Sequence, residues 1–443
     1  MLDRLLRHPS RVVALSFALA IGVGTVLLVL PVAKQGPGGV GFLTALFTST
    51  SAVCVTGLVT VDVSGTFTSF GQAVILGLIQ VGGFGIMTLT SVIALIVARR
   101  LGMRTRLLAS AESGGVDPGD LRHVLRGVAL FSVAAETVVA AVLTVRLLAR
   151  GDDLGSALWD GVFTSVSAFN NAGFSLWSDS LVGFVDDWTV ILVVAAAIVL
   201  GGIGFPVVLE LFRERGGAAG WSLHTKLTLL VTGVLVVLGT VAVLGFEWDN
   251  GSTLGALSTP DKLLAALFGG ITPRTAGFNS IDYGEATGET LLVTDILMFI
   301  GGGSGSTAGG IKVTTFALLG LMVLSEARGD RHVSVFRRRV PARAQRQALV
   351  VAFVGINAIV VATLALMATS DLYLYQALFE AISAFGTVGL TTGVTDQLDA
   401  FGESILIALM FIGRIGPHTV ALALVLRERE RLFSYPEERP LIG

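Results

Sequence analysis

Cysteine, histidine and charged residues are scarce in this chain of 443 residues. The single cysteine, Cys54, excludes an intrachain disulfide framework. The five histidines are scattered without the spacing of metal ligands, so no zinc site is predicted. No basic stripe interleaved with aromatic residues is present, which argues against nucleic-acid binding. No nucleophile–base pair or buried acidic pair predicts an enzyme.

Hydrophobic residues, in contrast, are abundant. They make up 53% of the chain, and charged residues only 14%. Several apolar runs reach the roughly 20 residues that a helix needs to cross a bilayer. The first run follows Arg4, Arg7 and Arg11 and could also be a signal peptide. Its length and the lack of a small-residue cleavage site favour a first spanning helix instead. The sequence therefore predicts an integral membrane protein.

A short polar pattern occurs four times, as "ALFTSTSAVCVTGL", "GVFTSVSAFNNAGF", "ALFGGITPRTAGF" and "ALFEAISAFGTVGL". In three copies a phenylalanine lies ten residues, and a serine six residues, before a glycine: Phe47, Ser51 and Gly57; Phe163, Ser167 and Gly173; Phe379, Ser383 and Gly389. In the third copy Phe268 lies nine residues before Gly277, and Ile271 replaces the serine. The chain is therefore predicted to contain a fourfold internal repeat.

Each polar stretch is too short to span a membrane and lies between two long apolar segments. The predicted fold is all-α, with eight transmembrane helices as four parallel helix–pore loop–helix repeats around a pseudo-fourfold central pore. The spans are expected near residues 11–31, 70–98, 124–148, 188–212, 224–246, 290–326, 345–369 and 402–426. The four repeats are expected at residues 1–105, 106–218, 219–335 and 336–427, followed by a C-terminal tail at 428–443.

The distribution of charge predicts the orientation of the repeats. Arginines crowd the connections at 99–126, 213–226 and 327–346 and the start of the tail, whereas the opposite loops are acidic. The positive-inside rule places the arginine-rich connections and both termini in the cytoplasm of a multi-pass protein of the cell membrane. All four repeats then point the same way. This separates the chain from transporters that are built on inverted repeats.

The repeated loop has the properties of an ion filter. Non-helical backbone at membrane depth is tolerated only inside protein or along a water-filled cavity. Four like-oriented loops that meet on one axis could ring it with carbonyl oxygens, which replace the water around a cation. Asp62, Asp179, Asp282 and Asp396 could form acidic rims. The alternative is that the four glycines merely end short helices as C-caps.

Four segments resemble the filter sequences of the Trk/Ktr/HKT superfamily of potassium transporters: "CVTGLVTVD", "NNAGFS", "PRTAGFN" and "GTVGLTTG". The resemblance covers nearly the whole chain and is closest to the Ktr-type pore subunit. In that superfamily a glycine in all four loops accompanies potassium selectivity. The resemblance implies that potassium binds the carbonyls of Val55, Thr56, Gly57, Asn171, Ala172, Gly173, Thr275, Ala276, Gly277, Thr387, Val388 and Gly389.

The stretch "GGGSGSTAGGIK" interrupts the sixth predicted span. A Walker loop requires Gly-Lys followed directly by Ser or Thr, and Ile311 separates Gly310 from Lys312. The other second helices have shorter glycine-rich centres, in which Gly83, Gly202 and Arg414 are approximately equivalent to Gly303. A lone arginine at mid-membrane is costly and by default marks function. The alternatives are a passive kink in the helix and a structural arginine that caps carbonyls.

The resemblance also implies a gate and partners. The expected gate is an intramembrane loop with an arginine opposite it: Gly301, Gly302, Gly303, Ser304, Gly305, Ser306, Thr307, Ala308, Gly309, Gly310, Lys312 and Arg414. The expected partners are a second copy in a homodimer, a cytosolic ring of nucleotide-binding (RCK-type) regulatory subunits, and membrane lipids. The basic connections at 99–126 and 327–346 are candidate docking surfaces for these subunits or for anionic lipids.

Potassium is the expected transported ion, and sodium could act as an activator. No organic cofactor is predicted in this chain. The competing hypothesis is a secondary transporter for another cation or a small solute. Cys54 is a further candidate residue: it lies next to the first filter loop and could be a free thiol at the filter edge, or a small residue packed behind it.

Overall fold

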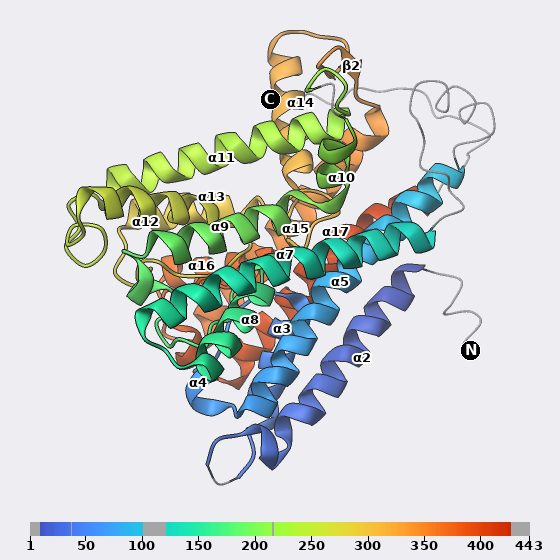
Figure 1. Cartoon of the computed structure of the whole chain (residues 1–443). Coiled ribbons are helices and arrows are strands. Elements are labelled where there is room, and N and C mark those ends of the chain that lie inside the picture. The colour runs from blue at the N-terminus through green and yellow to red at the C-terminus, as the bar shows by residue number, and fades with distance from the viewer. Residues whose placement is uncertain (1–8, 37, 101–120, 215–216, 427–443) are drawn as a thin grey trace.

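The computed structural model describes residues 9–36, 38–100, 121–214 and 217–426, which are coloured along the chain in Figure 1. Their regular secondary structure is almost entirely helical. One two-stranded hairpin, β1 (Ser334–Val335) and β2 (Arg338–Arg339), is the exception to the predicted all-α fold. Its two turn residues, Phe336 and Arg337, have φ of 49° and 61°. Positive φ at both turn positions matches the twist of a tight hairpin.

The first two predicted repeats each contain a long helix, a short helix and a second long segment. The first comprises α2 (Pro9–Val29), α3 (Phe42–Cys54), α4 (Val63–Thr66) and α5 (Ser69–Arg100). The second comprises α7 (Leu121–Arg150), α8 (Leu154–Asn170), α9 (Trp188–Ile203) and α10 (Phe205–Arg213). The boundary predicted at residues 105 and 106 and most of the first basic connection lie outside the described residues.

The last two predicted repeats have the same order of elements. The third comprises α11 (Leu223–Glu247), α12 (Thr259–Ile271), α13 (Gly288–Phe299) and α14 (Val313–Ala327). The fourth comprises α15 (Ala342–Thr369), α16 (Leu374–Gly386) and α17 (Ala400–Leu426). Single 3-10 turns occupy Pro31–Ala33, Val182–Phe184 and Thr395–Gln397. The predicted tail at 428–443 lies outside the described part of the chain.

Two of the predicted spans are interrupted. Between α9 and α10 the chain bends by 94° at Gly204, which has φ of 95°. Between α13 and α14 lies the glycine-rich segment that the sequence singled out. Among the described residues, five helices are long and apolar enough to cross a membrane, or six if the bent pair counts as one. The chain is thus a membrane protein, and the total of eight spans stays a prediction.

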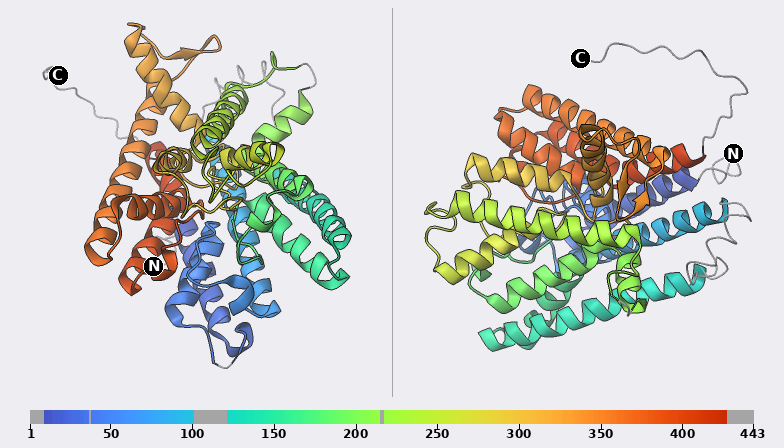
Figure 2. Two further views of the ribbon diagram at one scale, coloured as in Figure 1. Left: turned by 90° about the vertical axis from the view of Figure 1, so that its left-hand side faces the viewer. Right: turned by 90° about the horizontal axis from the view of Figure 1, so that it is seen from above.

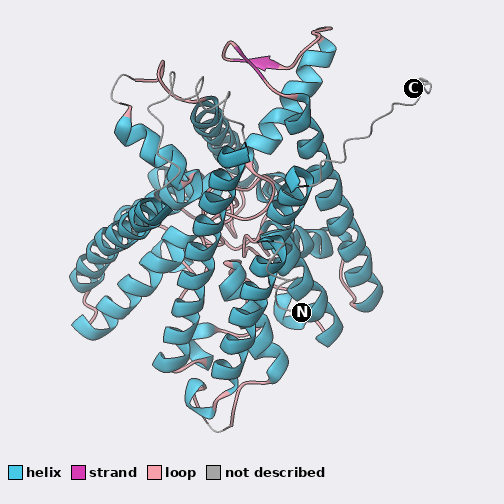
Figure 3. Cartoon of the chain, turned by 90° about the vertical axis from the view of Figure 1, so that its right-hand side faces the viewer, coloured by secondary structure: helices cyan, strands magenta, loops and turns pink. Residues whose placement is uncertain are grey.

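The four predicted repeats contact one another in chain order. α5 packs against α8, α9 against α12, α13 against α16, and α17 closes the circle on α3. Within each repeat the first helix packs on the short one, as α7 does on α8. Figure 2 shows the successive colours arranged around the centre, and Figure 3 shows the loops that gather there. The short helices therefore deliver their C-terminal loops to the middle of the molecule.

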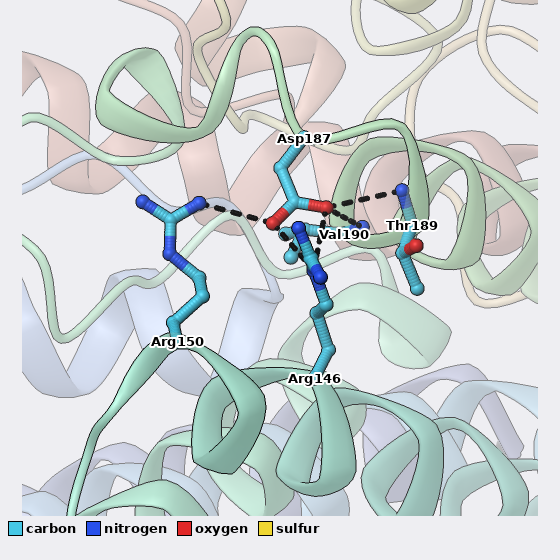
Figure 4. A network of polar contacts seen from close by, with 5 residues as sticks. All are labelled: Arg146, Arg150, Asp187, Thr189 and Val190. Carbon is cyan, nitrogen blue, oxygen red and sulfur yellow. Dashed lines mark hydrogen bonds and ion pairs between the residues drawn. The ribbon is translucent and has the colours of Figure 1, made fainter.

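An ion-pair network joins two helices of the second repeat (Figure 4). Asp187 accepts hydrogen bonds from Arg146 Nε at 2.8 Å and from Arg150 at 3.0 Å, and it also caps the first turn of α9. The Arg150 guanidinium lies 4.6 Å from the centre of the Phe184 ring. Burial raises the pKa of Asp187, but the arginine and backbone hydrogen bonds outweigh it and hold the pKa below its ordinary value.

Candidate functional site

The four repeated loops share an unusual backbone conformation. Two residues before each repeated glycine, a larger residue adopts the left-handed region: Val55, Asn171, Thr275 and Thr387, with φ of 57°, 59°, 75° and 50°. The glycines themselves have φ of 94°, 69°, 74° and 98° in chain order. Left-handed non-glycine residues cost about 1–3 kcal/mol each and cluster at functional sites. In α3, α8 and α16 the C-cap is the larger residue and not the glycine, so the C-cap interpretation of the glycines is wrong there.

The four glycines form a closed ring in chain order. A Cβ added at Gly57 would lie 2.5 Å from the carbonyl oxygen of Ala172. A Cβ added at Gly173, Gly277 or Gly389 would likewise lie 2.9, 2.2 or 2.3 Å from a carbonyl oxygen of the next loop. The contacted oxygens belong to Ala276, Val388 and Thr56, so the last loop meets the first. Only glycine leaves room for this approach of four backbones.

The ring presents backbone groups and little else. The eight non-glycine residues predicted as ligands are at most 1% exposed, so their side chains lie in the interior. A cavity of about 320 Å³ opens at one end of the ring, lined by all four glycines and by Asp62 and Asp396. Asp179 and Asp282, the other two residues of the predicted rim, do not line it. The structure thus brings all twelve predicted residues to one place.

A hydroxyl from each short helix holds its own loop. Ser51 and Ser383 accept hydrogen bonds from the amides of Gly57 and Gly389, at 3.0 and 3.1 Å. Ser167 and Thr272 instead donate to the carbonyls of Phe174 and Phe278, both at 2.7 Å.

The sequence comparison missed Thr272 because it counted back from the glycine and arrived at Ile271. Counting four residues forward from the repeated phenylalanine finds Ser51, Ser167, Thr272 and Ser383 alike. The third loop is one residue shorter, and the shortening falls after this hydroxyl.

Below the ring, the second helices approach the ends of the short helices closely. A Cβ added at Gly82, Gly201 or Gly413 would lie within 2.0 Å of a carbonyl oxygen of Val53, Phe169 or Phe385. These three glycines immediately precede Gly83, Gly202 and Arg414, so these positions are structurally equivalent. The third repeat differs. There the guanidinium of Arg274 donates to the carbonyl of Gly301 at 3.3 Å and to Thr232 Oγ1 at 3.2 Å.

The segment Gly301–Lys312 fills the space between the second and fourth repeats beneath the ring. Its backbone is bonded to α9, from Gly303 to the carbonyl of Gly202 at 2.8 Å and from Thr307 to that of Gly201 at 3.3 Å. On the other side, a Cβ added at Gly309 would lie 1.9 Å from Thr387 Oγ1 in the fourth loop. Small residues are therefore required where the segment passes under the ring.

Two buried cations hold this segment. Arg414, 1% exposed, donates hydrogen bonds to the carbonyl of Thr307 and to that of Gly82, the latter at 3.4 Å. The Lys312 ammonium, 7% exposed, donates to the carbonyl of Ala308. Within the described residues neither cation has a carboxylate at ion-pair distance. Arg414 thus contacts the segment directly. It also caps backbone carbonyls, which is what the alternative of a structural arginine predicts.

Cys54 is the last residue of α3, directly before Val55, and its side chain is fully buried among hydrophobic neighbours. Desolvation opposes ionisation of a thiol in such surroundings. The structure therefore favours the packed residue over a thiol that reagents can reach.

The chain belongs to the TrkH family of cation transport proteins, because the model of that family matches residues 12–435. This family membership agrees with the resemblance that the filter segments predicted.

Individual relatives are similar over nearly their whole length. The chain is 41% identical to the Ktr system potassium uptake protein B of Bacillus subtilis (strain 168), over 98% of this chain and 97% of the relative. It is 35% identical to the potassium/sodium uptake protein NtpJ of Enterococcus hirae, covering 98% and 97%. The crystal structure of the potassium transporter TrkH from Vibrio parahaemolyticus has a TM-score of 0.73 at 19% identity, covering 94% of this chain and 84% of that one. That likeness shows a shared fold.

Proposed function

We propose that the chain is the translocating subunit of a Ktr-type potassium-uptake system of the cell membrane. The observation that carries the proposal is the closed ring of four glycine loops, in which Gly57, Gly173, Gly277 and Gly389 each approach the backbone of the next loop. The name of the relative that is 41% identical, a potassium uptake protein, supports potassium as the ion.

In this proposal potassium crosses the ring by exchanging water for carbonyl oxygens. Residues with positive φ alternate with residues outside that region along each loop, which turns successive carbonyls toward the same side. The short helices α3, α8, α12 and α16 end at the ring, where the negative ends of their dipoles favour a cation. Eight spans in four like-oriented repeats, with both termini in the cytoplasm, would place the 320 Å³ cavity on the outer side.

The gate in this proposal is the segment Gly301–Lys312 together with Arg414. The segment lies under the ring, and Arg414 and Lys312 bring two positive charges close to the ion path. Opening would release the bonds from Gly303 to Gly202 and from Arg414 to Thr307. A cytosolic ring of nucleotide-binding subunits, bound to a homodimer of this chain, would control that release.

The NtpJ relative, named as a potassium/sodium uptake protein, makes sodium the second candidate ion or an activator. Purified protein in proteoliposomes should accumulate ⁸⁶Rb⁺ or potassium down an imposed gradient. Competition by unlabelled potassium, rubidium and sodium then ranks the ions. The proposal would be contradicted if unlabelled potassium did not reduce ⁸⁶Rb⁺ uptake, or if the protein transported only an organic solute.

A further inference from the structure

A buried carboxylate lies directly behind the fourth loop. Glu380 on α16 is fully buried. Its Oε1 accepts hydrogen bonds from Thr391 Oγ1 and from the amide of Thr392 at 3.3 Å. Its Oε2 accepts one from Thr395 Oγ1 at 2.8 Å. Among the described residues no cationic side chain pairs with it. All of its partners thus come from the five residues at 391–395.

These partners belong to the outer end of the filter. Thr391 follows Gly389 by two residues, and Thr391 and Thr395 line the cavity together with the four ring glycines. The carboxylate and Ser383 lie three residues apart on α16, so they share one face of the helix. Ser383 holds the amide of Gly389, and Glu380 holds the segment just after it. One face of α16 therefore holds the fourth loop at two places, at Gly389 through Ser383 and at residues 391–395 through Glu380.

The other three short helices have no carboxylate at the position equivalent to Glu380. Three residues before Ser51, Ser167 and Thr272 stand Thr48, Thr164 and Gly269. Among the described residues the hydroxyls of Thr48 and Thr164 have no hydrogen-bond partner, and glycine has no side chain. Charge-assisted hydrogen bonds are roughly twice as strong as neutral ones. The fourth loop thus has charge-assisted hydrogen bonds to its own short helix that its counterparts lack.

We propose that Glu380 is a positioning residue for ion discrimination, because it holds the outer end of the fourth loop and so sets the place of the carbonyls of Val388 and Gly389. This inference rests on the proposed function. The carboxylate does not touch the ion. It acts through Thr391, Thr392 and Thr395, which keep the loop from relaxing around a smaller cation.

The chain offers a matched control in Glu247 at the end of α11. It is also fully buried, and it accepts hydrogen bonds from Asn250, Thr253 and Thr287 at 2.6–2.9 Å. None of these partners belongs to a filter loop or lines the cavity at the ring. Loss of Glu247 should therefore lower stability as much as loss of Glu380, without changing ion preference.

The test is competitive uptake of potassium and sodium in proteoliposomes by full-length wild type, Glu380→Ala, Glu380→Gln, Thr395→Val and Glu247→Ala. Glu380→Ala should raise the apparent KM for potassium about tenfold and lower potassium-over-sodium discrimination, with the maximal rate per folded protein kept within about twofold. Glu380→Gln should retain most of the discrimination, because threonine hydroxyls can rotate to donate to, or accept from, an amide. Thr395→Val, which removes one donor, should shift KM in the same direction by roughly threefold.

Three outcomes overturn the inference: unchanged KM and discrimination in Glu380→Ala, an equal loss in Glu380→Gln, or an equal change of selectivity in Glu247→Ala. If Glu380→Ala does not fold, Thr395→Val decides, and wild-type selectivity in that variant overturns the inference as well. A wild type that takes up no potassium would instead refute the proposed function, so the two failures are distinguishable.

Discussion

The ring of glycines and the layer beneath it differ in how closely the four repeats match. In the ring, every loop has the same two left-handed positions and the same approach to the next loop. Beneath it, the first two repeats have Gly83 and Gly202 where the fourth has Arg414, and the third has the segment Gly301–Lys312. A site that surrounds a spherical ion requires similar oxygens on all sides. A single differing element, in contrast, is enough to obstruct a passage.

The comparison also separates two kinds of stabilisation. The ring is held by hydroxyl and backbone hydrogen bonds within each repeat, such as Ser51 to Gly57. The layer beneath also has bonds between repeats, such as Arg414 to Thr307 and Gly303 to Gly202. Interactions within one repeat preserve a local shape, whereas interactions between repeats can be exchanged when the repeats move.

Substitution of the ring glycines by serine should have the largest effect. An added Cβ would lie 2.2 Å from a carbonyl oxygen at Gly277, 2.3 Å at Gly389, 2.5 Å at Gly57 and 2.9 Å at Gly173. Each glycine also has positive φ, which strains any other residue. We expect Gly277→Ser to reduce potassium affinity or discrimination at least about tenfold and Gly173→Ser to be the mildest. Competition uptake gives this order, and unchanged selectivity in all four variants would refute the filter.

Arg414→Ala, or deletion within "GSGSTAGG", should increase transport, whereas the glycine substitutions impair it. Removal of the guanidinium releases the carbonyl of Thr307 and takes one positive charge from the passage. We expect initial influx to rise by up to about tenfold, a barrier decrease of about 1.4 kcal/mol, with potassium preference kept. Control by the proposed regulatory subunit should weaken in the same variants. The measurement is influx per folded protein with and without that subunit. Lys262→Gln is a control for the loss of a positive charge, because Lys262 bonds to the carbonyl of Trp248 and does not line the cavity at the ring. Wild-type flux and full regulation in both variants would make the segment a structural kink.

Asp187→Asn should affect stability and leave the ring unchanged. The pKa of Asp187 is lower in the folded state, so its ionised form stabilises the fold above the unfolded pKa. That contribution is lost as pH falls through the folded pKa. We expect the variant to lose about 1 kcal/mol at neutral pH, seen as a Tm lower by a few degrees. The difference should shrink in acid, and a constant difference across pH would contradict the ion-pair explanation.

Cys54→Ala should have the smallest effect. The thiol is fully buried, so small thiol reagents should leave uptake by the wild type and the variant alike unchanged. The loss of one buried sulfur should cost about 1 kcal/mol at most. Inhibition of the wild type that the variant abolishes would show that the thiol is reachable from the filter.

Much of the ring of glycines could be predicted because it depends on a local sequence pattern. The phenylalanine, hydroxyl and glycine recur at nearly constant spacing, and composition shows which segments lie in the membrane. Alignment of the four copies on their glycines placed Ile271 at the hydroxyl position, because the third loop is one residue shorter. Alignment on the phenylalanine, which lies in the helix before the loop, avoids this error. The hairpin at 334–339 was missed because two-residue strands give no periodicity.

The membrane character of the chain and the fourfold recurrence of the polar pattern follow from hydrophobicity and spacing along the sequence, whereas the family and the twelve candidate ligands came from the resemblance of four segments to known filter sequences. The sequence also singled out Arg414 and Gly301–Lys312. Only the tertiary structure decided that Arg414 bonds to Thr307, that the 94° bend falls at Gly204, and that Glu380 lies behind the fourth loop. Those features depend on which backbones approach one another across repeats, and distances between remote segments leave no periodic trace in the sequence.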